Sequence, residues 1–102
     1  TMSKIVLFDM DGTLTLPRKK IQHDMIRALR DLSSSVKIGI VTGSDFEYVM
    51  QQCGDMFDMS GIPVDRVDIF PCNGTKHYTW KSSAKVLILP GVFSFQTYRR
   101  FL

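Results

Sequence analysis

The 102 residues of this chain are enough for one modest hydrophobic core but not for two folded domains. Hydrophobic residues make up 44% of the chain and charged residues 23%, which is close to the globular average and excludes a disordered or fibrous class. The formal net charge of +3 is too small and too scattered for a nucleic-acid-binding surface. We therefore expect no nucleic-acid partner, whereas a small anionic substrate is compatible with this charge.

The sequence contains no stretch that approaches the ~20 apolar residues of a membrane-spanning helix. Its amino terminus also lacks a long apolar run behind basic residues. Cys53 and Cys72 have no neighbouring pattern typical of a zinc site or a disulfide framework. These observations predict a cytoplasmic protein with reduced, buried thiols and no membrane partner.

The chain begins with an alternation of strand and helix patterns. Residues 4–8 form a β-branched apolar run that ends at an Asp/Gly cluster, which predicts a strand buried on both faces. Residues 23–32 place apolar side chains at helical spacing and predict an amphipathic helix. Residues 36–41 return to a strand pattern.

A second helix is expected to begin after Ser44 or Asp45, since either side chain can cap a first turn, and to end near Gly54. Residues 67–70 predict a third strand, and the turn signal that follows predicts a hairpin strand over residues 77–80. Strands that alternate with helices predict an α/β fold with a parallel sheet and right-handed crossovers. The inward face of the second helix is predicted to comprise Phe46, Val49, Met50 and Cys53.

Polar residues follow each predicted parallel strand at its carboxyl end, where open parallel sheets bind ligands. Asp9 and Asp11 follow the first strand, and Gly12 permits a sharp turn of the backbone. Two carboxylates in one pocket favour a hard cation such as Mg²⁺, which would also screen an incoming phosphate. One carboxylate could then attack phosphorus while the other exchanges a proton. The later strand ends carry Thr42, Ser44 and Asn73.

Three segments together resemble the haloacid dehalogenase superfamily and, within it, the eukaryotic-type phosphomannomutases. The first runs from residue 7 to residue 15 and is followed by Pro17-Arg18, and it contains the Asp-Met-Asp-Gly-Thr motif. The second is residues 39–46, with Gly-Ser-Asp-aromatic where related sugar phosphatases usually have Thr-Gly-Arg. The third is Asn73-Gly74-Thr75 with Tyr78 after it.

The resemblance implies a Rossmann-like core and a role for each matching residue. Asp9 would be the phosphorylated nucleophile and a Mg²⁺ ligand, and Asp11 the general acid/base that also offers its carbonyl to the metal. Arg18 would bind substrate phosphate, and Thr42 or Ser44 would hold the transferring phosphoryl group. Asn73 is a further substrate-binding candidate, and a turn former is its alternative role. The implied substrate is a phosphorylated hexose.

The resemblance covers residues 2–81, which we interpret as part of a core domain, and residues 82–102 form a tail that does not match the family. A substrate-binding cap, a phosphate-binding lysine and further acids are expected in the family but cannot be identified in this sequence. Losing one such electrostatic element can cost about 100- to 1000-fold in rate, so we expect little mutase turnover from these residues. Residues 86–89 are β-prone enough to pair with an open sheet edge, and a homo-oligomer formed through such an edge is possible.

Three functions remain as hypotheses. The first is a phosphomannomutase-like transfer between the 6- and 1-hydroxyls of mannose, the second is a sugar-phosphate phosphatase of the same superfamily, and the third is a non-catalytic module. The remaining polar residues are interpreted as structural. His23 and His77 are expected at the surface or in packing without a partner, and four acids are expected to be solvated or to cap helices. These acids are Asp55, Asp58, Asp65 and Asp68.

Overall fold

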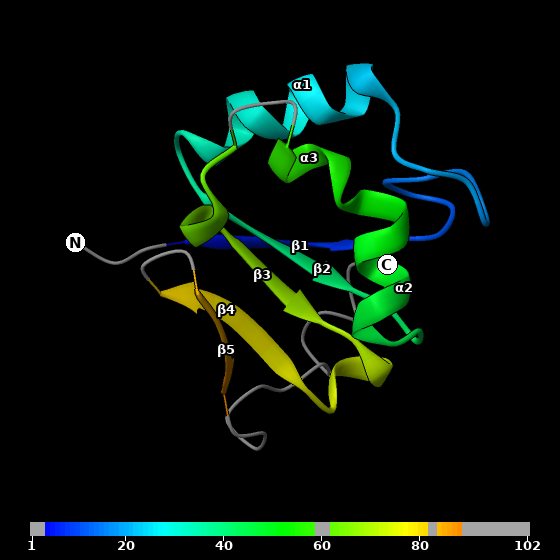
Figure 1. Cartoon of the computed structure of the whole chain (residues 1–102). Coiled ribbons are helices and arrows are strands. Elements are labelled where there is room, and N and C mark those ends of the chain that lie inside the picture. Colours follow the sequence, from blue (N-terminus) through cyan, green and yellow to red (C-terminus); the bar gives the residue numbers. More distant parts are fainter. Residues whose placement is uncertain (1–3, 59–61, 82–83, 89–102) are drawn as a thin grey trace.

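The computed structural model describes residues 4–58, 62–81 and 84–88. Its centre is a single five-stranded sheet in the order β1-β2-β3-β4-β5 (Figure 1). The strands are β1 Ile5–Asp9, β2 Lys37–Val41, β3 Val67–Phe70, β4 His77–Lys81 and β5 Ala84–Ile88. The first three are mutually parallel, while β4 runs antiparallel to β3 and β5 antiparallel to β4. The predicted α/β fold with a Rossmann-like sheet is confirmed, as is the hairpin strand after Asn73-Gly74.

The connections between the parallel strands are helical. They are α1 His23–Ser33, α2 Phe46–Cys53 and the short α3 Asp55–Asp58, with single 3₁₀ turns at Val64–Arg66 and Cys72–Gly74. Both crossovers advance in the same direction along the sheet, so their right-handedness puts α1 and α2 on the same face (Figure 1). Among the described residues, no helix has the length and apolar character needed to cross a bilayer.

The ends of α2 show why the chain folds locally as it does. Asp45 adopts extended backbone angles and accepts a hydrogen bond from the Tyr48 amide at 2.8 Å, so Asp45 rather than Ser44 caps the helix. Gly54 ends the helix, as predicted. The cap fixes the first turn of α2 directly after the carboxyl end of β2.

The core fills the space between the sheet and these helices. Alternate residues of β2 and β3 point toward the helices and are completely buried. Each such aliphatic side chain stabilises the fold by roughly 1.5–3 kcal/mol. The core residues from strands and helices are Ile26, Leu29, Ile38, Ile40, Val49, Cys53, Val67 and Ile69.

The prediction that the first strand is buried on both faces is wrong. Ile5 and Val6 remain 37% and 38% exposed, because β1 is an edge strand of the described sheet. An uninterrupted apolar run cannot distinguish a central strand from an edge strand, since only the order of the strands decides how many neighbours each has.

The predicted inward face of α2 is correct only in part. Val49 and Cys53 are fully buried, whereas Phe46 and Met50 are half-buried. Gln52 is buried instead, which the apolar pattern did not indicate. The difference arises because the loop before α1 also packs against this helix, with the Ile21 amide donating to the Gln52 carbonyl at 2.8 Å.

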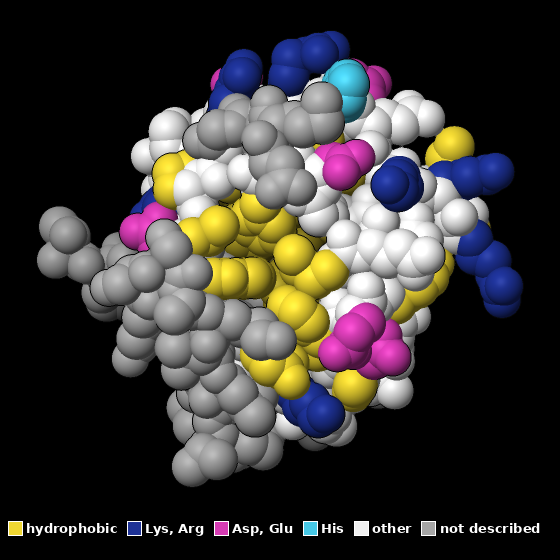
Figure 2. All heavy atoms as spheres, in the orientation of Figure 1, with side chains coloured by type: hydrophobic (Ala, Val, Ile, Leu, Met, Phe, Trp, Pro, Cys, Tyr) yellow, Lys and Arg dark blue, Asp and Glu magenta, His cyan; other side chains and the backbone are white. Residues whose placement is uncertain are grey.

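Four aromatic side chains from α2, α3 and β4 pack against one another. The ring centroid of Phe46 lies 4.7 Å from that of Tyr78, and the centroid of Phe57 lies 5.2 Å from that of Trp80. Figure 2 shows apolar side chains gathered in the middle of the view, over the region that these elements occupy in Figure 1. The cluster attaches the hairpin to the helical layer through tilted ring contacts.

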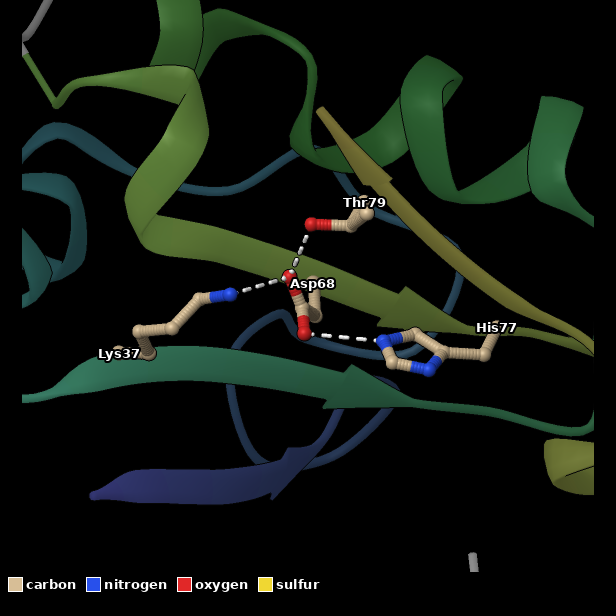
Figure 3. A network of polar contacts seen from close by, with 4 residues as sticks. All are labelled: Lys37, Asp68, His77 and Thr79. Atoms are coloured by element: carbon tan, nitrogen blue, oxygen red, sulfur yellow. Dashed lines mark hydrogen bonds and ion pairs between the residues drawn. The ribbon is translucent and has the colours of Figure 1, made fainter. Parts of the chain in front are cut away.

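A buried carboxylate joins three strands on the face of the sheet away from α1 and α2. Asp68 on β3 is only 5% exposed, and its carboxylate lies 3.0 Å from Lys37 Nζ, 2.9 Å from His77 Nε2 and 2.8 Å from Thr79 Oγ1 (Figure 3). The expectations that Asp68 is solvated or capping and that His77 has no partner are therefore wrong. Residues 68 and 77 occur in different strands, and only the β3–β4 register brings them together.

Replacing Asp68 by Asn is expected to lower the free energy of unfolding by about 1–3 kcal/mol, because the substitution removes an ionised acceptor that three strands share. Urea denaturation measures the change. Asp31→Asn is the matched control, since its ion pair with Arg30 is exposed and such pairs contribute about 0–1 kcal/mol. Equal effects of the two substitutions would contradict this account of the network.

Candidate functional site

The ends of the three parallel strands form one row. Asp9 pairs with Val41 across β1 and β2, and Val41 pairs with Phe70 across β2 and β3. The turns that follow these three residues therefore leave the sheet side by side at its carboxyl edge. All of the predicted site residues except Arg18 occur at these strand ends or in the turns directly after them.

The turn after β1 is organised by one backbone carbonyl. The Met10 oxygen accepts hydrogen bonds from the amides of Thr13, Leu14 and Thr15 at 3.2, 3.0 and 3.1 Å. Gly12 has φ +84°, a conformation that favours glycine, which confirms its predicted role in a sharp turn. The Met10 side chain is completely buried, so the turn that carries Asp11 is anchored in the core.

The turns after β2 and β3 are hydrogen-bonded to each other. The Asn73 amide donates to the Thr42 carbonyl at 2.8 Å, and the Cys72 amide donates to the Ser44 carbonyl at 2.7 Å. A Cβ at Gly43 would lie 3.0 Å from Asn73 Oδ1, so a side chain at this position would crowd the Asn73 amide group. Glycine therefore allows the two turns to approach this closely.

A cavity of about 530 Å³ opens between the first two turns and α2. Its volume lies within the range of small-molecule pockets. The residues that line it are Asp11, Pro17, Arg18, Ser44, Tyr48, Gln51 and Gln52. Three predicted site residues thus share one cavity, whereas Asp9, Thr42 and Asn73 lie in or next to the adjoining turns without lining it.

Asp11 is held by weak contacts from two directions. Its Oδ1 accepts a hydrogen bond from the Tyr48 hydroxyl at 3.4 Å and another from the Arg18 amide at 3.5 Å. The pKa of the Tyr48 phenol is raised, first by desolvation and then by the negative charge of Asp11. The Asp11 carboxylate is half-buried and is not engaged in an ion pair within the described part of the chain.

Ser44 and Thr42 differ in their surroundings. Ser44 is half-buried and lines the cavity, whereas Thr42 is only 5% exposed. The Thr42 hydroxyl accepts a hydrogen bond from the Ser44 amide at 3.2 Å. Thr42 therefore holds the backbone of Ser44 in place at the cavity wall.

The acids of the first turn are suited to part of a magnesium site. Mg²⁺ is commonly bound by one or two carboxylates together with water and substrate phosphate, and Asp9 and Asp11 are two acids separated by one residue. Within residues 4–58, 62–81 and 84–88, no group of three or more acids, histidines and cysteines could hold a metal ion. The donor chemistry of the two acids fits Mg²⁺ if substrate oxygens complete the set.

The polar wall that α2 contributes was missed by sequence reasoning. Tyr48, Gln51 and Gln52 occur at positions i, i+3 and i+4 of the helix and therefore share one face. This polar spacing is the sequence signal that could have predicted a second, polar face of the helix, whereas the apolar spacing predicts only the face that packs in the core. The structure shows that the polar face is turned toward the cavity that Asp11 and Arg18 also line.

Comparison with known proteins gives one consistent family. A phosphomannomutase of Spinacia oleracea is 36% identical over 85 residues, which are 83% of this chain and 32% of that protein. Phosphomannomutase 1 of Homo sapiens is 40% identical over 75 residues, which are 72% of this chain and 27% of that protein. This chain is phosphomannomutase-like. It spans about a third of the length of the spinach relative, and no family model matches the sequence.

The fold of this phosphomannomutase-like chain is also found in a solved structure. A haloacid dehalogenase-like hydrolase from Bacteroides thetaiotaomicron superposes with a TM-score of 0.65 at 18% identity, over 98% of this chain and 36% of that chain. The likeness establishes the fold of the haloacid dehalogenase superfamily. The sequence-based resemblance to this superfamily of enzymes, and to its phosphomannomutases, is confirmed.

Gln52 leads to a prediction on stability. Its side-chain Oε1 is buried and has no hydrogen-bond partner among the described residues, and such an orphaned group costs about 1–3 kcal/mol. Gln52→Met, which keeps the length of the side chain, is therefore expected to leave the free energy of unfolding unchanged or to raise it by about 1 kcal/mol. Chemical denaturation tests this, with Gln51→Met at the exposed neighbouring position as the control. A clear loss of stability in Gln52→Met alone would show that the buried amide is paired.

The two thiols of the phosphomannomutase-like chain differ in their environments. The expectation that both are buried holds for Cys53 but is wrong for Cys72. Burial raises the pKa of Cys53 to about 12, with a further contribution from the Asp11 charge, whereas Cys72 is only half-buried. Because the thiolate is the reactive form, a thiol reagent at pH 8 is expected to modify Cys72 at least about tenfold faster than Cys53. Mass spectrometry of the native protein measures both rates. Similar modification rates for the two thiols are expected only after denaturation. Similar rates in the native protein would therefore contradict the burial of Cys53.

Proposed function

We propose that this chain carries the phosphate-handling part of a phosphomannomutase-type phosphotransferase. The observation that supports the proposal most strongly is the shared cavity of Asp11, Arg18 and Ser44 beside the strand end that carries Asp9. This arrangement joins an acid/base group, a cation and a hydroxyl donor next to a candidate nucleophile. The proposed substrate is a phosphorylated hexose, and the proposed location is the cytoplasm.

In the proposed reaction, a carboxylate oxygen of Asp9 attacks the phosphorus of the sugar phosphate. A bond forms between this oxygen and phosphorus, and the bond from phosphorus to the sugar oxygen breaks. Asp11 gives its proton to the departing sugar oxygen and afterwards removes a proton from the hydroxyl that attacks the phospho-aspartate. Attack by another sugar hydroxyl gives the isomer, whereas attack by water gives free phosphate.

The neighbouring residues are assigned supporting roles. Arg18 would bind the phosphate, because it is the cation that lines the cavity. Its backbone has a left-handed conformation with φ 60°. Ser44 would donate to an oxygen of the transferring group, because it lines the cavity and Thr42 does not. Asn73 would maintain the position of the Thr42–Ser44 turn through the hydrogen bond that its backbone amide donates to the Thr42 carbonyl. When bound beside Asp9 and Asp11, Mg²⁺ would offset the negative charge of the acids and the substrate phosphate.

The proposal predicts that the purified chain with Mg²⁺ converts mannose 6-phosphate and mannose 1-phosphate into each other only slowly, in line with the little turnover expected from these residues. Asp9→Asn is expected to remove this residual transfer, because the substitution removes the nucleophile. Isomer conversion and phosphate release are followed together. Asp31→Asn, an exposed acid on α1, is the matched control and should retain the activity.

Each outcome of this experiment has a distinct meaning. Isomer conversion that Asp9→Asn removes supports a mutase. Phosphate release without conversion replaces the proposal by a sugar-phosphate phosphatase. If neither reaction occurs in the wild-type chain, the catalytic proposal for these 102 residues is wrong and a non-catalytic module is supported.

A further inference from the structure

The cavity contains one hydrogen bond that joins residues distant in sequence and that none of the assigned roles uses. The hydroxyl of Tyr48 donates to Asp11 Oδ1 at 3.4 Å, across 37 residues of sequence. Tyr48 is half-buried and lines the cavity together with Asp11. The contact therefore places a phenol directly against the proposed acid/base group.

The start of α2 fixes the position of Tyr48. The Tyr48 amide is the group that Asp45 caps, at 2.8 Å, so the backbone of Tyr48 is tied to the first turn of the helix. One helical turn further on, Gln52 is held by the bond from the Ile21 amide to its carbonyl. The phenol thus projects from a backbone segment that is anchored on both sides.

The other donor to Asp11 reaches the same oxygen. The Arg18 amide lies 3.5 Å from Asp11 Oδ1, so both hydrogen bonds that Asp11 makes with the described residues go to this oxygen. The Tyr48 hydroxyl and the Arg18 backbone amide are therefore both donors to Asp11 Oδ1. Two donors on Oδ1 leave Oδ2 as the oxygen of Asp11 that is available for proton exchange.

We propose that Tyr48 is a positioning residue for Asp11: its hydroxyl holds Oδ1 and so orients Oδ2 for proton transfer at the cavity. The part of the proposal that concerns proton transfer rests on the proposed function. The part that concerns the orientation of the Asp11 carboxylate rests only on the contacts described above, and it can be tested without any turnover.

The first experiment is spectroscopic and uses the whole chain. The side-chain ¹³Cγ resonances of the aspartates are recorded by NMR, and the Asp11 signal is assigned by its absence in Asp11→Asn. Tyr48→Phe is expected to shift the Asp11 signal, because the substitution removes a hydrogen bond to the charged carboxylate. Tyr78→Phe is the matched control, because Tyr78 on β4 does not line the cavity. An unchanged Asp11 signal in a folded Tyr48→Phe variant would overturn the proposal.

The second experiment is kinetic. Loss of one hydrogen bond worth about 1 kcal/mol corresponds to roughly a fivefold change in rate, so Tyr48→Phe is expected to lower kcat about fivefold at an unchanged KM. A raised KM at an unchanged kcat would overturn the proposal, because it would identify Tyr48 as a substrate contact instead. If the wild-type chain shows no turnover, the proposed function fails, and the NMR experiment alone decides whether Tyr48 orients Asp11.

Discussion

The parallel register of β1, β2 and β3 is the constraint on which the rest of this structure depends. It aligns Asp9, Val41 and Phe70 in one row and makes three turns leave the sheet at the same edge. Each turn is then fixed by its own backbone hydrogen bonds, through the Met10 carbonyl in the first and through mutual bonds in the other two. The side chains of the site need no long-range ion pair to meet, because the sheet has already brought their backbones together.

Two carboxylates on this sheet illustrate opposite uses of the same group. Asp68 is buried, and the side chains of Lys37, His77 and Thr79 satisfy its oxygens, so it tightens the packing of three strands. Asp11 is half-buried and receives only two long hydrogen bonds, both at Oδ1. A fully satisfied carboxylate is suited to stability, whereas an incompletely satisfied one beside a cavity remains available to a ligand or a proton.

Backbone strain in the described residues is concentrated around the cavity and its adjoining turns. The non-glycine residues with positive φ are Arg18, Cys72 and Asn73, with φ angles of 60°, 55° and 58°. Such conformations cost of order 1–3 kcal/mol each and persist where the surrounding structure enforces them. At Cys72 and Asn73 the enforcement is visible, since their amides donate to the Ser44 and Thr42 carbonyls. This concentration of strain fits the proposed role of the region, which needs fixed turns to hold phosphate.

The sequence by itself determined the α/β class, the three parallel strands, the capped second helix and the resemblance to phosphomannomutases, because these follow from local periodicity, turn residues and short motifs. Only the tertiary structure decided that β1 is an edge strand and that Asp68 is buried beside His77, since both depend on which strands become neighbours. The contact of Tyr48 with Asp11 could not be predicted from the sequence either. It joins residues of different elements, and no local pattern encodes the distance between them.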